Sequence, residues 1–536
     1  GGGAMIGSPL ATALMGLFKT DTNAGVWEAF VAMAAIYLVF MLIGTFGYRI
    51  PPAGWKPEGW TAPVNSNAMI SSKHVHLDNA HKTPQFWLLW LVLCMNVSAG
   101  IGIIGAASPM LQETFGGALP AAGVAPETVL DELVSAVEPA LVASAGPRYF
   151  GFVVGGSLDA ATCADLLTTG WDQTAFNGVT SPAAALVEEV VGAWLKEVLG
   201  LPPQASFGIT TGAQGGNTVG LAAARHRVLE RAGWDVERDG LQGAPRIRVV
   251  AGAERHATID RALRLLGVGA GAVEPVAAGP NGATDPDALV RALGAGSGEP
   301  TIVCVQAGNV NTGDFDDLSI ACDAAHRHGA WVHVDGAFGL WAAASPSLAH
   351  RVAGLDAADS WVVDGHKWLN LPYDTGFAFC ADPQAHAASM SYTAAYLVGQ
   401  GEGLVRAPSD FVPESSRRAR GFVTWAALRE LGRDGLADLI DRCCALARRF
   451  AEQLETIEGV SVANDVVLNQ VLVGFGGDER TDRVIEGVQR DGTCWMGGTT
   501  WRGARLMRIS VSNWTTTEAD VDRSVEAIRR VLASVR

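Results

Sequence analysis

The chain has 536 residues, a formal net charge of -16 and a mean hydropathy of +0.20. An acidic chain whose basic residues cluster only at Arg417, Arg418 and Arg420 is a poor match for nucleic acid, so we predict no nucleic-acid partner. The eight cysteines show no C-x-x-C pairs and no companion histidine spacing, so we predict neither a metal site nor a disulfide framework.

The charge divides the chain into two parts. Residues 1–117 hold equal numbers of acidic and basic side chains, so the net charge of -16 falls on residues 118–536. Within the first part, residues 29–48 and 83–112 carry no charge, and each stretch is long enough to cross a bilayer as a helix. Flanking tryptophans favour this interpretation over a buried helical hairpin. We therefore predict an all-α membrane segment with spans at about residues 29–48 and 85–107.

The location predicted for the second part conflicts with this topology. The loop at residues 49–83 is rich in lysine and arginine, so the positive-inside rule places it in the cytoplasm. The next span would then carry residues 118 onward outside, whereas the cysteines suit a reducing cytosol. We expect a membrane-associated chain whose second part is cytoplasmic. One hypothesis that removes the conflict is a chance fusion of two unrelated coding pieces near Gly117.

Residues 118–536 alternate between strand and helix patterns. Buried strands are predicted at residues 207–209, 247–251, 301–306, 331–334, 360–363 and 376–380. A helix is predicted between them at Asp316–His328, ended by Gly329. This alternation predicts an α/β fold, with a mostly parallel sheet and helices on both faces. A long helix, a Val-rich strand at 466–473 and a closing strand and helix predict a small α+β C-terminal domain. The predicted domains are 1–117, 118–428 and 429–536.

Two predicted strands end at residues that suit catalysis. Lys367 follows one of them in Val-Val-Asp-Gly-His-Lys-Trp-Leu-Asn, and Asp335 ends another in Ala-Trp-Val-His-Val-Asp-Gly-Ala. Taken alone, Lys367 reads as an ordinary exposed lysine. Open α/β sheets, however, bind ligands at the carboxyl ends of their strands, so the two residues are expected to share one site.

An amine in such a site can form a Schiff base with pyridoxal phosphate. That cofactor also needs an acid for its ring nitrogen, a flat group against its ring and a cradle for its phosphate. Asp335 is the candidate acid, because a carboxylate keeps the ring nitrogen protonated; its alternative role is a strand-end cap. His256 is the candidate flat group, with Ala337 at the other face of the ring. Alternatively, His256 is a partly buried residue that begins a helix.

The candidate phosphate cradle is Thr-Thr-Gly-Ala-Gln-Gly-Gly-Asn-Thr, residues 210–218, which follows a short strand and opens a helix. Small residues let backbone N–H groups approach a phosphate, and the helix N-terminus favours an anion. We predict that Thr211, Gly212, Ala213 and Gln214 bind the phosphate. The stretch lacks the lysine of a P-loop and the dinucleotide fingerprint, and a plain strand-to-helix connection is the alternative.

A series of motifs in one order makes residues 118–536 resemble the group II pyridoxal-phosphate decarboxylases. This family includes aromatic amino acid, glutamate and histidine decarboxylases. The motifs are Pro147–Phe152, Ser181–Ala184, Thr211–Asn217, His256, Val334–Ala337, Asp364–Leu369 and Arg417–Arg418. The resemblance implies a fold-type-I pyridoxal-phosphate-dependent transferase fold, and a homodimer with active sites between its subunits.

For the individual residues, the resemblance implies that Lys367 forms the Schiff base, His256 stacks on the ring and Asp335 protonates it. These three are the predicted catalytic residues. His366 is implied to help hold the phosphate, and we add Asn309 to the predicted cofactor-binding residues. The implied reaction releases the carboxylate of an L-amino acid as CO2 and leaves the amine.

Several alternatives stay open. Relatives commonly place a tyrosine for Cα protonation in the loop before Arg417, whereas residues 397–424 contain no tyrosine. A decarboxylating oxidative deamination, a carbon-carbon lyase reaction and a catalytically silent protein are therefore considered. The substrate is not predicted, because Tyr149, Phe152 and Trp171 could line an aromatic pocket or belong to the core.

The first part of the chain has its own resemblance. The run from Ala13 to Trp60 looks like the middle of a major facilitator transporter of the oxalate/formate antiporter type. Transport in that family needs two six-helix halves around a midplane site. Most of both halves is missing from residues 1–117, so we expect a transporter fragment that tethers the chain to a membrane and does not transport.

Overall fold

The computed structural model describes residues 17, 31–32, 122–296, 298–392 and 407–535. The chain divides into two compact units, Gly1–Val142 and Ala143–Arg536. The described part of the first unit contains helix α5 (Pro126–Val137) and the turn η1 (Glu138–Ala140). Nearly all of the predicted spans at 29–48 and 85–107 lie outside the described residues. Within the described ranges, no helix combines the length and the apolar character that crossing a membrane requires.

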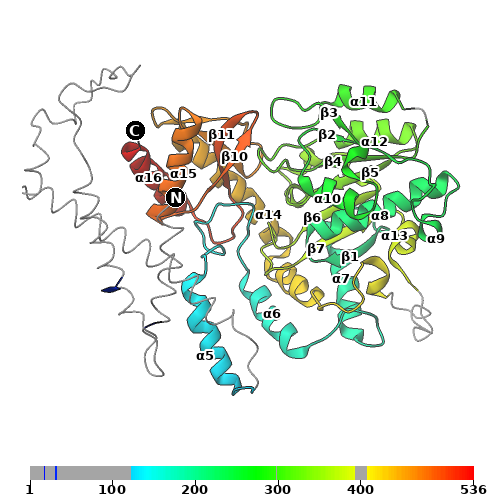
Figure 1. Ribbon diagram of the computed structural model, residues 1–536, viewed down its shortest axis with the longest axis horizontal. Helices are drawn as coiled ribbons and strands as arrows, with labels where there is room; N and C mark the ends of the chain where they lie inside the picture. Colours follow the sequence, from blue (N-terminus) through cyan, green and yellow to red (C-terminus); the bar gives the residue numbers. More distant parts are fainter. Residues whose placement is uncertain (1–16, 18–30, 33–121, 297, 393–406, 536) are drawn as a thin grey trace, which may run out of the picture. The chain divides into compact units, whose positions relative to one another are not determined.

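The larger sheet of the second unit has the strand order β1-β7-β6-β5-β4-β2-β3 (Figure 1). Strands β3, β2, β4, β5 and β6 run parallel, and β7 is antiparallel to both of its neighbours. The strands are β1 (Ser206–Thr210), β2 (Arg248–Gly252), β3 (Val273–Val276), β4 (Thr301–Gln306), β5 (Trp331–Asp335), β6 (Ser360–Asp364) and β7 (Gly376–Cys380). The predicted mostly parallel sheet is therefore confirmed. Strand β3 was not predicted, because a four-residue segment that includes a proline gives little strand signal.

Helices cover both faces of this sheet, because alternate strand residues point to opposite sides. Val249 belongs to a buried apolar cluster that includes residues of α8 and α10, whereas Val250 belongs to another cluster that includes residues of α11 and α12. The helices are α6 (Asp159–Trp171), α7 (Pro182–Val198), α8 (Ala213–Arg231), α9 (Val236–Asp239), α10 (Ala257–Leu265), α11 (Pro286–Gly294), α12 (Leu318–Arg327) and α13 (Pro383–Met390). Short 3-10 turns are η2 (Ala270–Ala272), η3 (Gly339–Ala344), η4 (Ala349–Val352), η5 (Leu355–Ala357) and η6 (Pro408–Phe411).

A smaller antiparallel sheet has the order β10-β11-β9-β8. Its strands are β8 (Ser461–Val462), β9 (Gln470–Gly474), β10 (Gly497–Trp501) and β11 (Ala504–Ser510), and α15 (Asp478–Asp491) and α16 (Glu518–Ser534) accompany them. The long helix α14 (Gly421–Glu455) is kinked at Gly432, where φ is +61°, and its buried residues belong to one apolar cluster with residues of both sheets. The predicted boundary at 428/429 falls inside α14. The predicted domain limits stay predictions.

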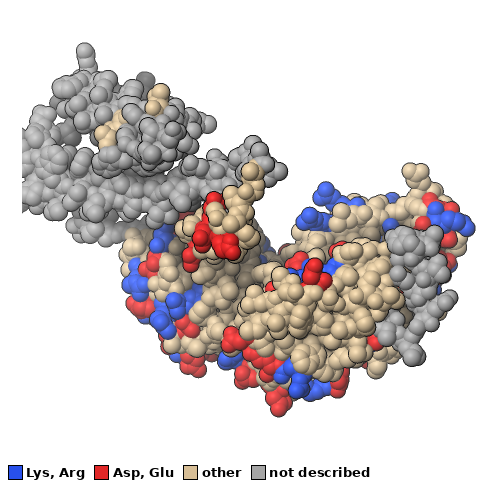
Figure 2. Space-filling view, turned by 90° about the horizontal axis from the view of Figure 1, so that it is seen from below, with Lys and Arg blue, Asp and Glu red and all other residues tan. Residues whose placement is uncertain are grey.

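Charged side chains of both signs are mixed on the face seen in Figure 2. On that face, the described lysine and arginine side chains alternate with aspartate and glutamate and leave a broad uncharged area between them. This distribution gives no continuous basic surface for a phosphate backbone on the described part of that face.

Candidate active site

A cavity of about 290 Å³ lies where β5, β6 and the start of α8 meet. Nine of the ten residues predicted to bind a cofactor line it, although they come from four separate stretches of the chain. The lining residues are Thr211, Gly212, Ala213, Gln214, His256, Thr258, Gln306, Gly308, Val310, Asp335, Ala337, Phe338, Asp364, His366 and Lys367. The volume is close to the lower end of the range for small-ligand sites.

Asn309 is the predicted residue that does not line the cavity. Its Oδ1 accepts the backbone N–H groups of Asn311 at 2.9 Å and Thr312 at 3.3 Å. Its Nδ2 donates to the Glu254 carbonyl at 3.3 Å. The side chain is buried and shapes the turn after β4, and the residues on either side of it in the chain reach the cavity instead.

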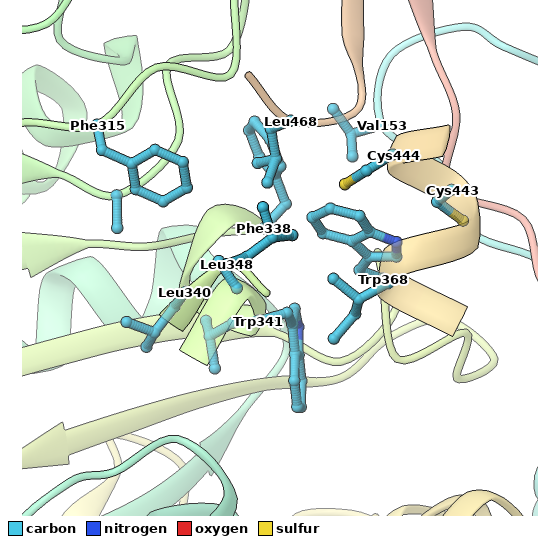
Figure 3. Packing of buried hydrophobic residues seen from close by; sticks show 14 of the residues in the cluster. Val153, Phe315, Phe338, Leu340, Trp341, Leu348, Trp368, Cys443, Cys444 and Leu468 are labelled. Carbon is cyan, nitrogen blue, oxygen red and sulfur yellow. The ribbon is translucent and has the colours of Figure 1, made fainter. Parts of the chain in front are cut away.

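Lys367 extends into the cavity just after β6. Its Nζ lies 2.9 Å from Oδ2 of Asp364, whose side chain is only 3% exposed. The next residue, Trp368, is fully buried, and Figure 3 shows its indole beside Cys444 and near Phe338. A buried tryptophan directly after the lysine holds this part of the backbone in place.

Asn370 ties the lysine turn to two other segments. Its Oδ1 accepts the N–H of Gly156 at 2.6 Å and that of Trp514 at 3.0 Å. Gly155 lies so close to this turn that a Cβ there would stand 2.0 Å from the Lys367 carbonyl oxygen. Only glycine fits this approach, so three distant segments of the chain jointly position Lys367.

The predicted anion cradle lies at the start of α8. A Cβ on Gly212 would lie 2.9 Å from Cε1 of His366, so the absence of a side chain leaves room for that ring. The Ala213 N–H donates to Oδ1 of Asp364 at 2.5 Å. The unpaired N–H groups and dipole of a helix start attract anions. In this structure the Asp364 carboxylate already accepts one of these N–H groups, that of Ala213.

Asp335 ends β5 and is 5% exposed. Its Oδ1 accepts the Ala337 N–H at 3.3 Å, and its Oδ2 accepts Nδ2 of Asn217 at 3.2 Å. A buried carboxylate costs free energy unless hydrogen bonds compensate it. These donors stabilise the charge and leave the carboxylate facing the cavity.

The two histidines of the cavity are held by backbone donors. Nδ1 of His256 accepts the Thr258 N–H at 3.3 Å, and Nδ1 of His366 accepts the Thr375 N–H at 3.1 Å. Burial lowers the pKa of both rings, and for His256 the nearby Asp335 opposes this effect. Both rings are therefore neutral at pH 7, with the hydrogen on Nε2.

The donor set fits pyridoxal phosphate. One cavity contains an amine, a buried carboxylate, a neutral imidazole and a glycine-opened helix start, which are the groups that this cofactor requires. The sequence analysis did not predict six lining residues: Thr258, Gln306, Gly308, Val310, Phe338 and Asp364. Asp364 lies three residues before Lys367, and this spacing was a usable signal. Gly308 and Val310 reach the cavity from loops whose course only the tertiary structure sets.

The aromatic residues considered for a substrate pocket lie elsewhere in the described structure. Tyr149 stacks on Trp495 with ring centroids 4.8 Å apart, and Trp171 makes an edge contact with Phe422 at 5.5 Å. Phe152 is 63% exposed. None of these three predicted residues lines the cavity.

Comparison with known proteins supports this chemistry. The model of the pyridoxal-dependent decarboxylase conserved domain matches residues 111–475. Tryptophan decarboxylase 1 of Oryza sativa subsp. japonica is 28% identical over 436 residues, covering 75% of this chain and 84% of that protein. Phenylacetaldehyde synthase of a Rosa hybrid cultivar is 26% identical over 336 residues, covering 60% and 65%. The crystal structure of Oryza sativa TDC with PLP and tryptamine superposes with a TM-score of 0.74 at 24% identity, covering 87% and 99%.

The same comparisons give no support to the resemblance of residues 1–117 to a transporter. The family match begins at residue 111 and so includes the last residues of that segment. The structural likeness to Oryza sativa TDC concerns the fold, which is the expected fold-type-I arrangement of a mixed sheet between helices.

Proposed function

The chain belongs to the pyridoxal-dependent decarboxylase family, and from this premise we propose that it acts on an aromatic L-amino acid. Its reaction is the pyridoxal-phosphate-dependent release of an amino acid carboxylate as CO2. The observation that carries the assignment to this site is the meeting of Lys367, Asp335, His256 and the start of α8 in one cavity.

Each of the nine predicted residues that line the cavity has a proposed task. Pyridoxal phosphate, when bound, supplies an aldehyde for an amine and a ring that withdraws the electrons of the broken bond. Lys367 holds the cofactor through Nζ and yields that position to the amine of the substrate. Asp335 keeps a proton on the ring nitrogen through its charge. His256 and Ala337 contact the ring, whereas His366 and residues 211–214 hold the phosphate.

The aromatic substrate class rests on the relatives. The curated proteins that resemble this chain include decarboxylases named for tryptophan, tyrosine and DOPA. L-Glutamate and L-histidine, the substrates of other decarboxylases of the group, represent the contrasting substrate classes.

A second candidate reaction has its own observation. Residues 397–424 contain no tyrosine, and one relative is named a phenylacetaldehyde synthase. Without a proton donor for Cα, dioxygen can take up the electrons of the broken bond. An amino acid, dioxygen and water would then yield an aldehyde, CO2, ammonia and hydrogen peroxide.

One assay separates these possibilities. The purified chain is loaded with pyridoxal phosphate and given L-tryptophan, L-tyrosine, L-DOPA, L-phenylalanine, L-glutamate or L-histidine, with Lys367→Ala as control. CO2, amine, aldehyde and hydrogen peroxide are measured together. CO2 with equal amine from an aromatic substrate supports the first proposal, and CO2 with equal aldehyde and peroxide supports the second. Turnover of glutamate or histidine alone would overturn the aromatic assignment.

We also propose that the chain is a homodimer. On α6 and in the loop and helix that follow, Leu166, Leu167, Trp171, Val179 and Leu186 are more than half exposed. Large exposed apolar side chains on these consecutive elements favour a protein interface. Light scattering during size-exclusion chromatography should give twice the mass of 56.0 kDa, and a monomer that is active would contradict the proposal.

Membrane attachment through residues 1–117 remains a prediction from hydropathy alone. It is tested by carbonate extraction of membranes from cells that express the full chain, beside a chain that begins at residue 118. Recovery of only the full chain in the pellet would support attachment, and release of both into the supernatant would overturn it.

A further inference from the structure

We propose that Asn217 and His333 are positioning residues, which fix the orientation of the Asp335 carboxylate and stabilise its negative charge through a hydrogen-bond chain that starts at Trp331. The inference rests on the proposed role of Asp335 as the partner of the cofactor ring nitrogen. Neither Asn217 nor His333 lines the cavity, so both act through Asp335.

The hydrogen-bond chain links strands β5 and β6 to helix α8 and ends at Asp335 in the cavity. Nε1 of Trp331 donates to Oγ of Ser360 at 2.9 Å, and Ser360 Oγ lies 2.8 Å from Nδ1 of His333. Nε2 of His333 lies 2.9 Å from Oδ1 of Asn217. Nδ2 of Asn217 then donates to Oδ2 of Asp335 at 3.2 Å. All five residues are buried, so water does not compete for these bonds.

The two ends of the chain set its direction. An indole N–H can only donate and a carboxylate can only accept. Ser360 receives the indole hydrogen and gives its own to Nδ1 of His333, which places the imidazole hydrogen on Nε2. Asn217 receives that hydrogen on Oδ1 and turns its amide N–H toward Asp335. Every donor therefore points toward the carboxylate, and such aligned chains strengthen their last bond.

The protonation state of His333 agrees with this direction of the hydrogen bonds. Complete burial lowers its pKa to about 4, although Asp335 acts in the opposite direction. The ring is neutral at physiological pH and can serve as acceptor and donor at once. Gly220 of α8 lies against it, because a Cβ there would stand 2.6 Å from Cε1 of His333. The helix thus packs closely on the ring and restricts it to one orientation.

Asn217 is the junction of the network, because its amide nitrogen contacts a second residue besides Asp335. Its Nδ2 also lies 3.1 Å from Oγ1 of Thr258, which is 2.8 Å from Nδ1 of His256. The amide of Asn217 therefore connects the residue proposed for the ring nitrogen with the residue proposed for the ring face, and Oγ1 of Thr258 adds a longer direct contact of 3.5 Å with Oδ2 of Asp335. An alanine at position 217 removes both connections, whereas a leucine at position 333 removes only the support behind Asn217.

The test measures the ring nitrogen directly. Protein is loaded with pyridoxal phosphate that carries ¹⁵N in the ring, and the nitrogen chemical shift is followed against pH. Loss of a hydrogen bond to a charged group corresponds to about a tenfold to hundredfold change in equilibrium. In Asn217→Ala and His333→Leu, the pH at which the ring nitrogen loses its proton should fall by about one to two, and cofactor affinity by about tenfold.

Matched variants separate positioning from simple loss of stability. His333→Gln keeps one acceptor and one donor at a similar separation, so it should restore cofactor affinity to within about threefold of wild type. Asn469→Ala also removes a buried amide, which donates to the Val511 carbonyl at 2.9 Å outside the cavity. It should lower the melting temperature without changing the ring nitrogen. Trp331→Phe removes only the first donor and should cause a smaller change in the same direction.

The outcomes are distinguishable. If wild-type protein binds no cofactor in a Lys367-dependent manner, the proposed function fails before the variants are compared. If wild type loads normally and the ring nitrogen in Asn217→Ala and Trp331→Phe titrates as in wild type, the positioning role is overturned and the network is structural. If His333→Leu does not fold, Asn217→Ala, Trp331→Phe and His333→Gln decide whether the positioning role holds.

Discussion

Lys367 and Asp364 form an ion pair inside the cavity, with Nζ 2.9 Å from Oδ2. The other oxygen of the same carboxylate accepts the Ala213 N–H at 2.5 Å. One acidic group therefore contacts both the amine proposed for the cofactor aldehyde and a donor proposed for its phosphate. The proposed cofactor contacts would replace both contacts of Asp364.

The first prediction concerns this carboxylate. Asp364→Asn removes a negative charge from a buried cavity that receives a phosphate dianion, and an asparagine can still bond the Ala213 N–H through its carbonyl oxygen. Repulsion of roughly 1 kcal/mol disappears, so the dissociation constant for pyridoxal phosphate should fall about fivefold. Fluorescence titration of the apo protein measures this. Asp374→Asn, which breaks the outer pair with Arg420, is the control; equal or weaker binding by Asp364→Asn would contradict the account.

The second prediction concerns Trp368, the fully buried neighbour of Lys367. Trp368→Ala leaves a large cavity against α14 and should lower the free energy of unfolding by about 3–5 kcal/mol. Trp425→Ala is the matched control, because Trp425 lies on α14 but is 43% exposed. Trp425→Ala should lower the free energy of unfolding by less than about 1 kcal/mol. Urea titration of both variants measures the difference. Similar losses in both variants would count against the proposed anchoring of the lysine turn.

The third prediction concerns two helical glycines. A Cβ on Gly220 would lie 2.8 Å from Nδ1 of His333, whereas nothing lies within 4 Å of a Cβ on Gly170. Gly220→Ala should lower the free energy of unfolding by about 1–3 kcal/mol through overpacking. Gly170→Ala should raise it by up to about 1 kcal/mol, because alanine restricts the unfolded chain. Thermal unfolding of both variants measures the contrast, and stabilisation by Gly220→Ala would show that His333 is not confined.

The fourth prediction is a dependence of stability on pH. Burial lowers the pKa of His333 from 6.5 to about 4, so the unfolded chain binds a proton at this residue before the folded chain does. Its contribution to stability is complete above pH 6.5 and is lost as the pH falls from 6.5 to about 4. The loss amounts to about 3 kcal/mol. Urea unfolding across this range should show a shallower decline for His333→Gln; parallel curves would contradict the low pKa.

Some of this site could be predicted from local sequence. Asp335 ends one short, fully buried strand and Lys367 follows another, and parallel strands bring their carboxyl ends to one edge of a sheet. The glycine-rich start of α8 was recognisable because small residues precede a long helix. These signals need only neighbouring residues, and the structure brings nearly all of them into one cavity.

Other parts required the tertiary structure. Asn309 looked like a cofactor ligand, but its side chain turns to the backbone of its own loop. His333 alternates with Val332 and Val334 inside a buried strand, and nothing nearby in sequence indicates that Asn217, 116 positions away, is its partner. Contacts between distant segments leave no periodic pattern, so the network behind Asp335 was not predicted.

The central claim is that Lys367 carries the cofactor, and the composition of the chain makes this simple to measure. After residue 117 the sequence has two lysines, Lys196 and Lys367, and Lys196 donates to the Pro203 and Ala205 carbonyls. The full chain is loaded with pyridoxal phosphate, reduced with borohydride, digested and analysed by mass spectrometry. The account predicts a reduced cofactor adduct on the Lys367 peptide, which persists in Lys196→Ala and disappears in Lys367→Ala. An adduct on another lysine, or no adduct on any peptide, would contradict it.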